Sequence, residues 1–274
     1  MVFLNGGEGN LEAMKHRVMS GNKAKVRPKK PAKPESPRIY GDLAAWFHLM
    51  THPREYGREA KFIRGLLKPA GARGRPTLLE LGAGGGNNAS HLKKHFDLTL
   101  SDLSPAMLKV SRALNPECRH VRGDMRALRL KREFDAVLVH DAVMYMLSAG
   151  DLKRMAKTVA LHLKPGGRAL VLPDFTTETF APRTTTGGET IGPRTLRYAE
   201  VTRGTKGARP RAVVDYTILL QEKGKSDRIV VDRHVFGLFP RKTWIDVLKG
   251  AGLRVKSLVD PWERDVFLCE KPLR

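Results

Sequence analysis

The sequence predicts an α/β fold, namely a doubly wound, mostly parallel sheet with an antiparallel strand insertion. Five short apolar stretches between residues 78 and 172 alternate with helical patterns, which is typical of strands in a parallel sheet. A glycine-rich stretch, residues 82–86, directly follows the first apolar stretch, as in a turn that joins a strand to a helix. Residues 213–221 and 228–236 alternate in polarity, which indicates antiparallel strands.

The elements of the sheet are predicted from apolar runs and capping signals. Ser104 and Pro105 form a helix start, because serine caps a helix and proline is tolerated at its first position. The apolar centre of residues 134–140 indicates a strand that is buried on both faces. The predicted strands are 78–81, 98–102, 120–124, 134–140 and 168–172, the helices between them are 86–96, 105–114 and 151–163, and helix 241–249 and strands 253–259 and 266–270 close the chain.

The ends and the insertion define the expected domain boundaries. Residues 1–38 predict a basic disordered tail, because they are too rich in lysine and proline to pack. Residues 39–274 then form one domain, which opens with a helical cover over residues 39–70. In this cover Asp42 is expected to cap a first helix. The antiparallel insertion is expected over residues 174–240, although residues 173–211 give no definite element.

The composition of the chain indicates which partners and which cellular compartment to expect. A formal net charge of +22, from 50 Lys and Arg against 28 acids, predicts non-specific attraction to nucleic acid. Cys118 and Cys269 are too few for a disulfide framework and lie in no metal-binding spacing, so no metal is expected. The sequence contains no run near the roughly 18 apolar residues of a membrane span and no secretory signal. A cytoplasmic protein that binds no membrane is therefore predicted.

The glycine-rich stretch predicts a loop that binds a nucleotide cofactor. Glycine lacks a Cβ atom, so a ligand can lie directly against the backbone. A dinucleotide fingerprint needs glycine at the sixth position, where this chain has Asn87. An acid two positions before Gly-x-Gly-x-Gly fits better, and Glu80, Gly82, Gly84 and Gly86 complete that pattern. A chance glycine-rich turn is the alternative.

Two acids at predicted strand ends suit an adenosine. Asp102 ends the second strand, twenty positions beyond Gly82, where an ionised carboxylate can accept both hydroxyl protons of a ribose. Asp124 ends the third strand and can accept a proton from the adenine amine, while Met125 offers an apolar surface to the ring. Either aspartate could instead be a surface or capping residue.

These motifs together resemble a known family. The stretch from Glu80 to Gly86 resembles motif I of the class I S-adenosylmethionine-dependent methyltransferases, and residues 123–126, 134–137, 163–167 and 251–253 resemble that family's later landmarks in the right order. The resemblance covers about residues 40–270. Residues 173–180 and 237–240 are loosely similar to the macrolide amino-sugar N,N-dimethyltransferases and other small-molecule methyltransferases, whereas residues 140–143 differ from them.

The resemblance implies a Rossmann-like methyltransferase domain, S-adenosyl-L-methionine as cofactor and a small-molecule acceptor. The residues expected to bind the cofactor are Glu80, Gly82, Ala83, Gly84, Gly86, Asp102, Leu103, Asp124, Met125, His140 and Tyr40. The backbone N–H groups that open helix 86–96 are expected to meet the carboxylate of the cofactor's methionine part.

The fourth predicted strand is followed by the candidate catalytic residues, His140 and Tyr145. His140 could remove a proton from the attacking nucleophile, because imidazole titrates near neutral pH. A histidine that is only hydrogen-bonded at the strand end is the alternative. His234 is a weaker candidate, and Tyr40 either covers the site or packs a helix onto the core.

The predicted reaction is direct in-line transfer of a methyl group to an N or O nucleophile of a small molecule. The acceptor atom, the number of transfers, the oligomeric state and the role of the tail stay open. One alternative is a methyltransferase of RNA ribose or ring nitrogens, motivated by the net charge. Residues 140–143 lack the prolines expected of an enzyme that methylates base amines. The other alternative is a non-catalytic regulatory protein, which would need a blocked acceptor pocket.

Overall fold

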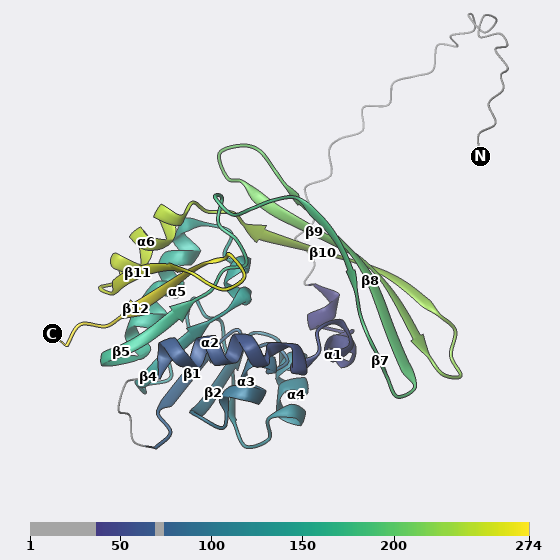
Figure 1. Ribbon diagram of the computed structural model, residues 1–274, viewed down its shortest axis with the longest axis horizontal. Helices are drawn as coiled ribbons and strands as arrows, with labels where there is room; N and C mark the ends of the chain where they lie inside the picture. Colours follow the sequence, from purple (N-terminus) through teal and green to yellow (C-terminus); the bar gives the residue numbers. More distant parts are fainter. Residues whose placement is uncertain (1–36, 69–73, 274) are drawn as a thin grey trace, which may run out of the picture. The chain divides into compact units, whose positions relative to one another are not determined.

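The computed structural model describes residues 37–68 and 74–273, and a seven-stranded sheet is its centre (Figure 1). The strand order is β11-β12-β5-β4-β1-β2-β3. The strands are β1 (Thr77–Leu81), β2 (Asp97–Asp102), β3 (Arg119–Arg122), β4 (Phe134–Val139), β5 (Leu163–Val171), β11 (Arg254–Val259) and β12 (Asp265–Glu270). β1 to β5 pair in parallel, and β12 is antiparallel to both β5 and β11. The predicted fold class is confirmed.

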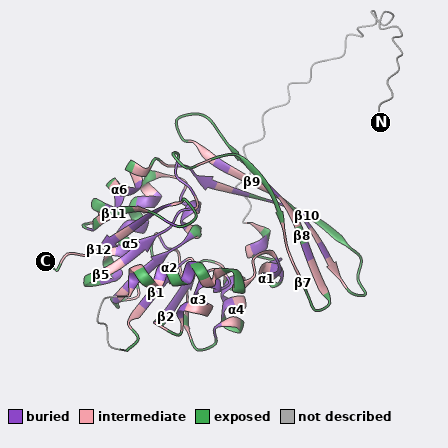
Figure 2. Ribbon diagram, in the orientation of Figure 1, coloured by how far each residue is buried: buried purple, intermediate pink, exposed green. Residues whose placement is uncertain are grey.

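Helices cover both faces of this sheet because its buried strands are apolar on both sides (Figure 2). Successive side chains of a strand point to opposite faces. Leu79 and Val137 therefore pack against α5 and α6, whereas Leu78 and Leu138 pack against α2 and α3. The helices are α2 (Gly57–Leu67), α3 (Asn87–Leu92), α4 (Pro105–Leu114), α5 (Ala149–His162) and α6 (Arg241–Lys249).

The insertion forms a second, antiparallel sheet of long strands (Figure 1). Its strand order is β10-β9-β8-β6, with β7 paired to β8. The strands are β6 (Arg183–Gly187), β7 (Thr190–Ile191), β8 (Arg194–Gly204), β9 (Arg211–Glu222) and β10 (Arg228–Gly237). Leu196, Ile218 and Val230 on its inner face pack against Ile39 and Trp46 of the N-terminal cover. The second sheet and the cover are thus held together by one apolar cluster.

The predicted helical cover is present, with α2 as its one long helix, but short helical turns replace the first helix that Asp42 was expected to cap. It consists of η1 (Arg38–Tyr40), η2 (Ala44–Trp46), α1 (Phe47–Met50), η3 (Pro53–Tyr56) and α2. Asp42 caps no helix here, because its carboxylate pairs with the Arg38 side chain instead. Arg38 itself belongs to the fold, since its N–H donates to Asp232 Oδ1 at 2.9 Å. The predicted tail is therefore too long by at least this residue and Pro37, and its residues 1–36 lie outside the described part of the chain.

The ends of other helices and strands also differ from the predicted ones. The third strand ends at Arg122, before Asp124, and the helix after the glycine loop ends at Leu92 rather than at residue 96. Strands β6, β7 and β8 occupy the stretch for which no element was predicted. β6 is an edge strand with four consecutive exposed residues, so its sequence has no alternation to find. No helix within residues 37–68 and 74–273 is long and apolar enough to cross a membrane.

Candidate active site

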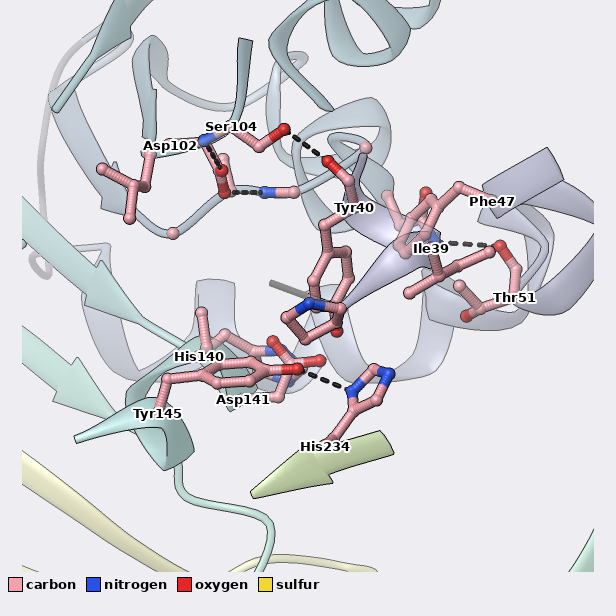
Figure 3. Close-up of a pocket in the computed structure, with 18 of the residues that line it drawn as sticks. Ile39, Tyr40, Phe47, Thr51, Asp102, Ser104, His140, Asp141, Tyr145 and His234 are labelled. Carbon is pink, nitrogen blue, oxygen red and sulfur yellow. Dashed lines mark hydrogen bonds and ion pairs between the residues drawn. The ribbon is translucent and has the colours of Figure 1, made fainter. Parts of the chain in front are cut away.

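A cavity of about 880 Å³ lies between the carboxyl ends of the parallel strands and the inner face of the second sheet (Figure 3). We call its two sides the loop half (residues 80–88, 102–105 and 123–126) and the sheet half (Asp174, Tyr198, Glu200, Tyr216 and His234). The predicted site residues that line the cavity are Tyr40, Glu80, Gly82, Ala83, Gly84, Asp102, Leu103, Asp124, Met125, His140 and Tyr145. Gly86 is not among the lining residues.

The glycine loop is shaped by backbone that only glycine adopts easily. Gly82 has φ +78°, and a Cβ added to it would lie 2.5 Å from the Ala142 Cβ. Gly86 also has positive φ, and its own Cβ would meet Asn115 at 2.3 Å. A Cβ on Gly84 would have no atom nearer than 3.9 Å. Gly82 and Gly86 therefore fix the turn, while Gly84 borders open space in the cavity.

Glu80 is a buried acid that lacks a full set of partners. Its side chain is 3% exposed, and Oε2 has no hydrogen-bond partner among the described residues. Burial raises the pKa of Glu80 to about 8, and nearby acids add to this, whereas His140 opposes it. A cation placed beside Glu80 would return it to the ionised form. The predicted cofactor carries a sulfonium and an ammonium group, so this orphaned carboxyl fits it.

Asp102 is held at the end of β2 with both oxygens directed. Oδ2 accepts from the Gly84 N–H at 2.9 Å and Oδ1 accepts from the Ser104 N–H at 2.8 Å. Burial raises the pKa of Asp102 above its ordinary value, although these N–H groups oppose the shift. Each oxygen keeps a lone pair for a ribose hydroxyl. Leu103 beside it is 59% exposed, which leaves an apolar surface at the edge of the cavity.

Asp124 carries a partner that the sequence did not reveal. Arg126 Nη2 donates to Asp124 Oδ2 at 2.6 Å, and Arg126 Nη1 also reaches Asp151 Oδ1 at 3.1 Å. The hydrogen bonds from Arg126 to Asp124 hold the pKa of Asp124 below its ordinary value, although burial and the nearby Asp151 oppose this shift. Asp124 is thus a fixed carboxylate beside Met125. Its predicted contact with an adenine amine stays a prediction.

His140 follows β4 and lies between the carboxylates of Glu59 and Asp141, of which Figure 3 shows Asp141 beside it. Its Nε2 is 3.0 Å from Glu59 Oε1 and its Nδ1 is 3.2 Å from Asp141 Oδ1. Burial alone would lower the pKa of His140, but Asp141 and Glu59 outweigh it and raise the pKa well above 6.5. The two carboxylates therefore favour the protonated imidazolium of His140, which would have to lose a proton before it could act as a base. Its predicted role as general base stays a prediction that needs this extra step.

The acids around His140 come from distant parts of the chain. Glu59 lies on α2, and it pairs with the Arg264 guanidinium from the turn between β11 and β12. Asp174 follows β5, and burial raises its pKa to about 6. Asp141 and Asp174 both line the cavity. Glu59 and Arg264 carried no signal in the sequence, because no local motif marks residues that meet only after folding. Asp174 lies in the stretch 173–180 that carries part of the resemblance, but it was given no role there.

Aromatic side chains line the boundary between the two halves of the cavity. The Tyr40 ring meets the Tyr145 ring edge-on, with 5.9 Å between the ring centroids. The Tyr145 hydroxyl lies 2.7 Å from His234 Nδ1 (Figure 3). Tyr216 donates to Glu200 Oε2 at 2.9 Å from the second sheet. The sheet half thus offers aromatic faces and a fixed carboxylate, which suit a cationic or sugar-like ligand.

Comparison with known proteins gives a consistent set of similarities. Residues 78–167 match the family model described as a methyltransferase domain. The chain is 30% identical over 222 residues to the dTDP-3-amino-3,4,6-trideoxy-alpha-D-glucopyranose N,N-dimethyltransferase of Streptomyces venezuelae, which covers 80% of this chain and 92% of that protein.

Solved structures show the same likeness. The crystal structure of Streptomyces venezuelae DesVI is similar with a TM-score of 0.73 and 29% identity, over 84% of this chain and 97% of that chain. The S-adenosylmethionine-bound structure of CalS10, an amino pentose methyltransferase from Micromonospora echinaspora, gives a TM-score of 0.67 at 22% identity, over 84% and 96% of the two chains.

Proposed function

The chain belongs to the class I S-adenosylmethionine-dependent methyltransferases, and from this premise we propose that it methylates the amino nitrogen of a nucleotide-linked amino sugar. The relative that is 30% identical acts on a dTDP-linked 3-amino sugar and adds two methyl groups. We therefore propose two successive transfers to one nitrogen. The observation that carries the proposal is a cavity that joins a cofactor loop to a wall of acids and aromatic rings.

The loop half would hold the cofactor. S-adenosyl-L-methionine, when bound, supplies a methyl group that its positive sulfur already makes electrophilic. Glu80 would pair with the cofactor's positive charge, and Asp102 would accept from its ribose hydroxyls. Asp124, Met125 and Leu103 would border the adenine. These assignments rest on the orphaned oxygen of Glu80 and on the free lone pairs of Asp102 described above.

The sheet half would hold the acceptor. Asp141, Asp174 and Glu200 line the cavity, so an amine that arrives as an ammonium ion meets negative charge there. Tyr145, Tyr216 and the other rings offer faces to the sugar and to the cation. The protein's task is then to align the nitrogen with the methyl carbon and the departing sulfur, because the methyl group needs no further activation.

The two alternative functions fare differently. A non-catalytic regulator would need a blocked acceptor pocket, whereas here the cavity extends from Gly84 to Tyr216 and the chain belongs to a family of enzymes. An RNA methyltransferase was motivated by the net charge of +22 alone. The cavity adds nothing to that motive, because both acids and arginines line it. RNA is kept as an outcome of the test below.

The proposal is tested by comparing three acceptors with one enzyme preparation. Calorimetry with S-adenosylhomocysteine first establishes that the cofactor site is intact. Turnover is then measured with the dTDP-3-amino sugar of the relative, with the matching dTDP sugar that carries a hydroxyl at the same carbon, and with bulk RNA. We expect methylation of the amine only. Methylation of RNA with a steep dependence on salt would instead support the alternative, and methylation of the hydroxyl would contradict transfer to nitrogen.

A further inference from the structure

Three polar side chains form a line that leads away from the cavity wall. The Tyr145 hydroxyl lies 2.7 Å from His234 Nδ1, and His234 Nε2 lies 3.3 Å from Asp232 Oδ2. Tyr145 comes from η4 (Asp141–Tyr145), whereas His234 and Asp232 are alternate residues of β10 with the same buried orientation. Tyr145 and His234 both line the cavity, and His234 is 3% exposed.

We propose that this line is a proton relay, in which Tyr145 takes the proton that the acceptor amine loses and passes its own proton to His234. The inference rests on the proposed function, because it supplies the base that N-methylation needs. Tyr145 is then the catalytic residue, and His234 and Asp232 are positioning residues that act through it. The relay takes the role for which His140 was the candidate in the sequence.

The hydrogen-bonding chemistry of the three groups fixes the direction of the relay. An ionised carboxylate attracts an N–H group and repels a nitrogen lone pair, so the charge of Asp232 favours the tautomer of His234 with its proton on the nitrogen that faces this carboxylate. His234 Nδ1 is then an acceptor, and the Tyr145 phenol donates to it. His234 Nε2 lies 3.3 Å from Asp232 Oδ2 without the alignment of a hydrogen bond, and contacts between catalytic groups are often poorly aligned before substrate binds. Gaining a proton on Nδ1 would make His234 a cation and strengthen that contact.

The Asp232 carboxylate is held in place by the N-terminal cover. Its Oδ1 accepts from the Arg38 N–H and its Oδ2 from the Ile39 N–H, both at 2.9 Å. Although burial raises the pKa of Asp232, the contacts with His234 and with these N–H groups outweigh it and lower the pKa. Asp232 therefore stays ionised and oriented. The next residue after Ile39 is Tyr40, and its ring packs against the Tyr145 ring (Figure 3).

His140 is poorly suited to the same task. Both of its ring nitrogens already face carboxylates, those of Glu59 and Asp141, and these carboxylates raise its pKa. His234 faces one carboxylate and one phenol, so one of its nitrogens is an acceptor. The titratable groups that face His234 are Asp232 on its own strand, Tyr145 from η4, and the rings of Tyr40 and Tyr216 at 5.6 and 5.0 Å between centroids.

The proton balance closes over one round of methylation. The acceptor arrives as an ammonium ion; one N–H bond breaks, an O–H bond forms on Tyr145, and the former phenol proton bonds to His234 Nδ1. The freed nitrogen lone pair then attacks the methyl carbon, while the C–S bond breaks and its electron pair stays on sulfur. The product leaves as a methylated ammonium ion. His234 then returns its proton through Tyr145 to water that enters the open cavity.

Turnover over a range of pH tests the relay. His234→Asn keeps an acceptor for the Tyr145 hydroxyl but cannot become a cation, and Tyr145→Phe removes the hydroxyl. With the dTDP-3-amino sugar as the probe, both variants should lose about 10²-fold in kcat at neutral pH. The loss should shrink toward alkaline pH, where the amine loses its proton to solvent, and S-adenosylhomocysteine affinity should not change. A loss that is equal at every pH, or no loss, would overturn the relay.

A spectroscopic measurement decides the relay even if this amino sugar is not the acceptor. In protein labelled with ¹⁵N-histidine, the His234 signals at neutral pH should be those of a neutral ring with its proton on Nε2. Tyr145→Phe should shift the Nδ1 signal. A ring protonated on both nitrogens in the resting enzyme, or a Nδ1 signal that ignores Tyr145→Phe, would overturn the proposal. Failure of the wild-type enzyme to methylate the sugar would count against the proposed function alone.

A matched control separates the relay from the general cost of removing a buried histidine. His162 is also fully buried, and both of its ring nitrogens are hydrogen-bonded, to Thr158 O and to the Leu130 N–H. It lies on α5, away from the cavity. His162→Asn should leave kcat per folded molecule and its pH dependence unchanged. A change in the pH profile equal to that of His234→Asn would contradict a specific role for His234.

Discussion

The loop half and the sheet half of the cavity are built in opposite ways. The loop half comes from three short stretches, each at the end of a strand of one parallel sheet. The sheet half combines a residue from the loop after β5 with residues from three antiparallel strands. Under the proposed function, the loop half would hold a cofactor that the whole family shares, whereas the sheet half would fit one particular acceptor. Variants of the two halves should therefore separate cofactor affinity from acceptor affinity.

The largest effect is expected where the glycine loop is tightest. In Gly82→Ala, a Cβ would meet Ala142 at 2.5 Å and the backbone would be strained at φ +78°. We expect S-adenosylhomocysteine affinity to fall on the order of 10²-fold or more by calorimetry.

Gly224→Ala is the control for that variant. Gly224 has φ +79°, with no atom within 4 Å of the added Cβ. It should lower stability by about 1 kcal/mol but leave cofactor affinity unchanged. Equal losses of S-adenosylhomocysteine affinity in the two variants would show that backbone strain in general, and not the shape of the glycine loop, lowers this affinity.

The next largest effect is expected at Asp102. Asp102→Asn replaces charge-assisted acceptors with a neutral amide, so cofactor affinity should fall by about 10-fold to 100-fold. Asp97 begins the same strand at its far, exposed end, where it lies 3.6 Å from Arg132. Asp97→Asn should bind S-adenosylhomocysteine as the wild type does. If Asp102→Asn also binds normally, the ribose is not held by this residue.

A smaller effect, confined to the acceptor, is expected at Glu200. Tyr216 and Thr202 hold its carboxylate at the sheet half, at 2.9 and 3.0 Å. Glu200→Gln should raise KM for the amino sugar by roughly 10-fold and leave cofactor affinity unchanged. Glu222→Gln on β9, whose partners Arg194 and Lys225 lie outside the cavity, is the control. A shift in cofactor affinity in Glu200→Gln would contradict the division into two halves.

The smallest effect is one of stability. Because the folded pKa of His140 is raised, its ion pairs stabilise the fold fully below about pH 6.5, and this contribution is lost as pH rises through the folded value. The free energy of unfolding of the wild type minus that of His140→Gln should therefore be largest at acidic pH, on the order of 1 kcal/mol, and fall with rising pH. Denaturant titrations at several pH values measure it. A difference that grows with pH would contradict the raised pKa.

The same contrast explains what the sequence could predict. The loop half follows from contiguous motifs, and the helices 105–114 and 241–249 were predicted with the bounds that the structure has. The contacts of the proposed relay could not be predicted from the sequence. Tyr145 and His234 are 89 positions apart, and Asp232 and Arg38 are 194 positions apart. Glu59 and Arg264 are 205 positions apart. No local pattern announces such contacts, so His234 could be named only as a weak candidate.

The strands of the second sheet also differ in how well their sequences predict them. Strands β9 and β10 alternate in polarity and were predicted, because one face of each is buried. Strand β6 is exposed along four of its five residues, and its threonines and glycine read as a loop. It is a strand because β8 supplies its hydrogen-bond partners. The structure of this edge is therefore set by its neighbour, and not by its own sequence.

The central claim is that the enzyme methylates an amine in the cavity between the two halves. The most direct measurement is identification of the product, by mass spectrometry and NMR, after reaction of the dTDP-3-amino sugar with S-adenosylmethionine. The account predicts two methyl groups on the sugar nitrogen, added one after the other. A methyl group on oxygen, or an unmodified sugar from an enzyme that binds S-adenosylhomocysteine normally, would contradict it.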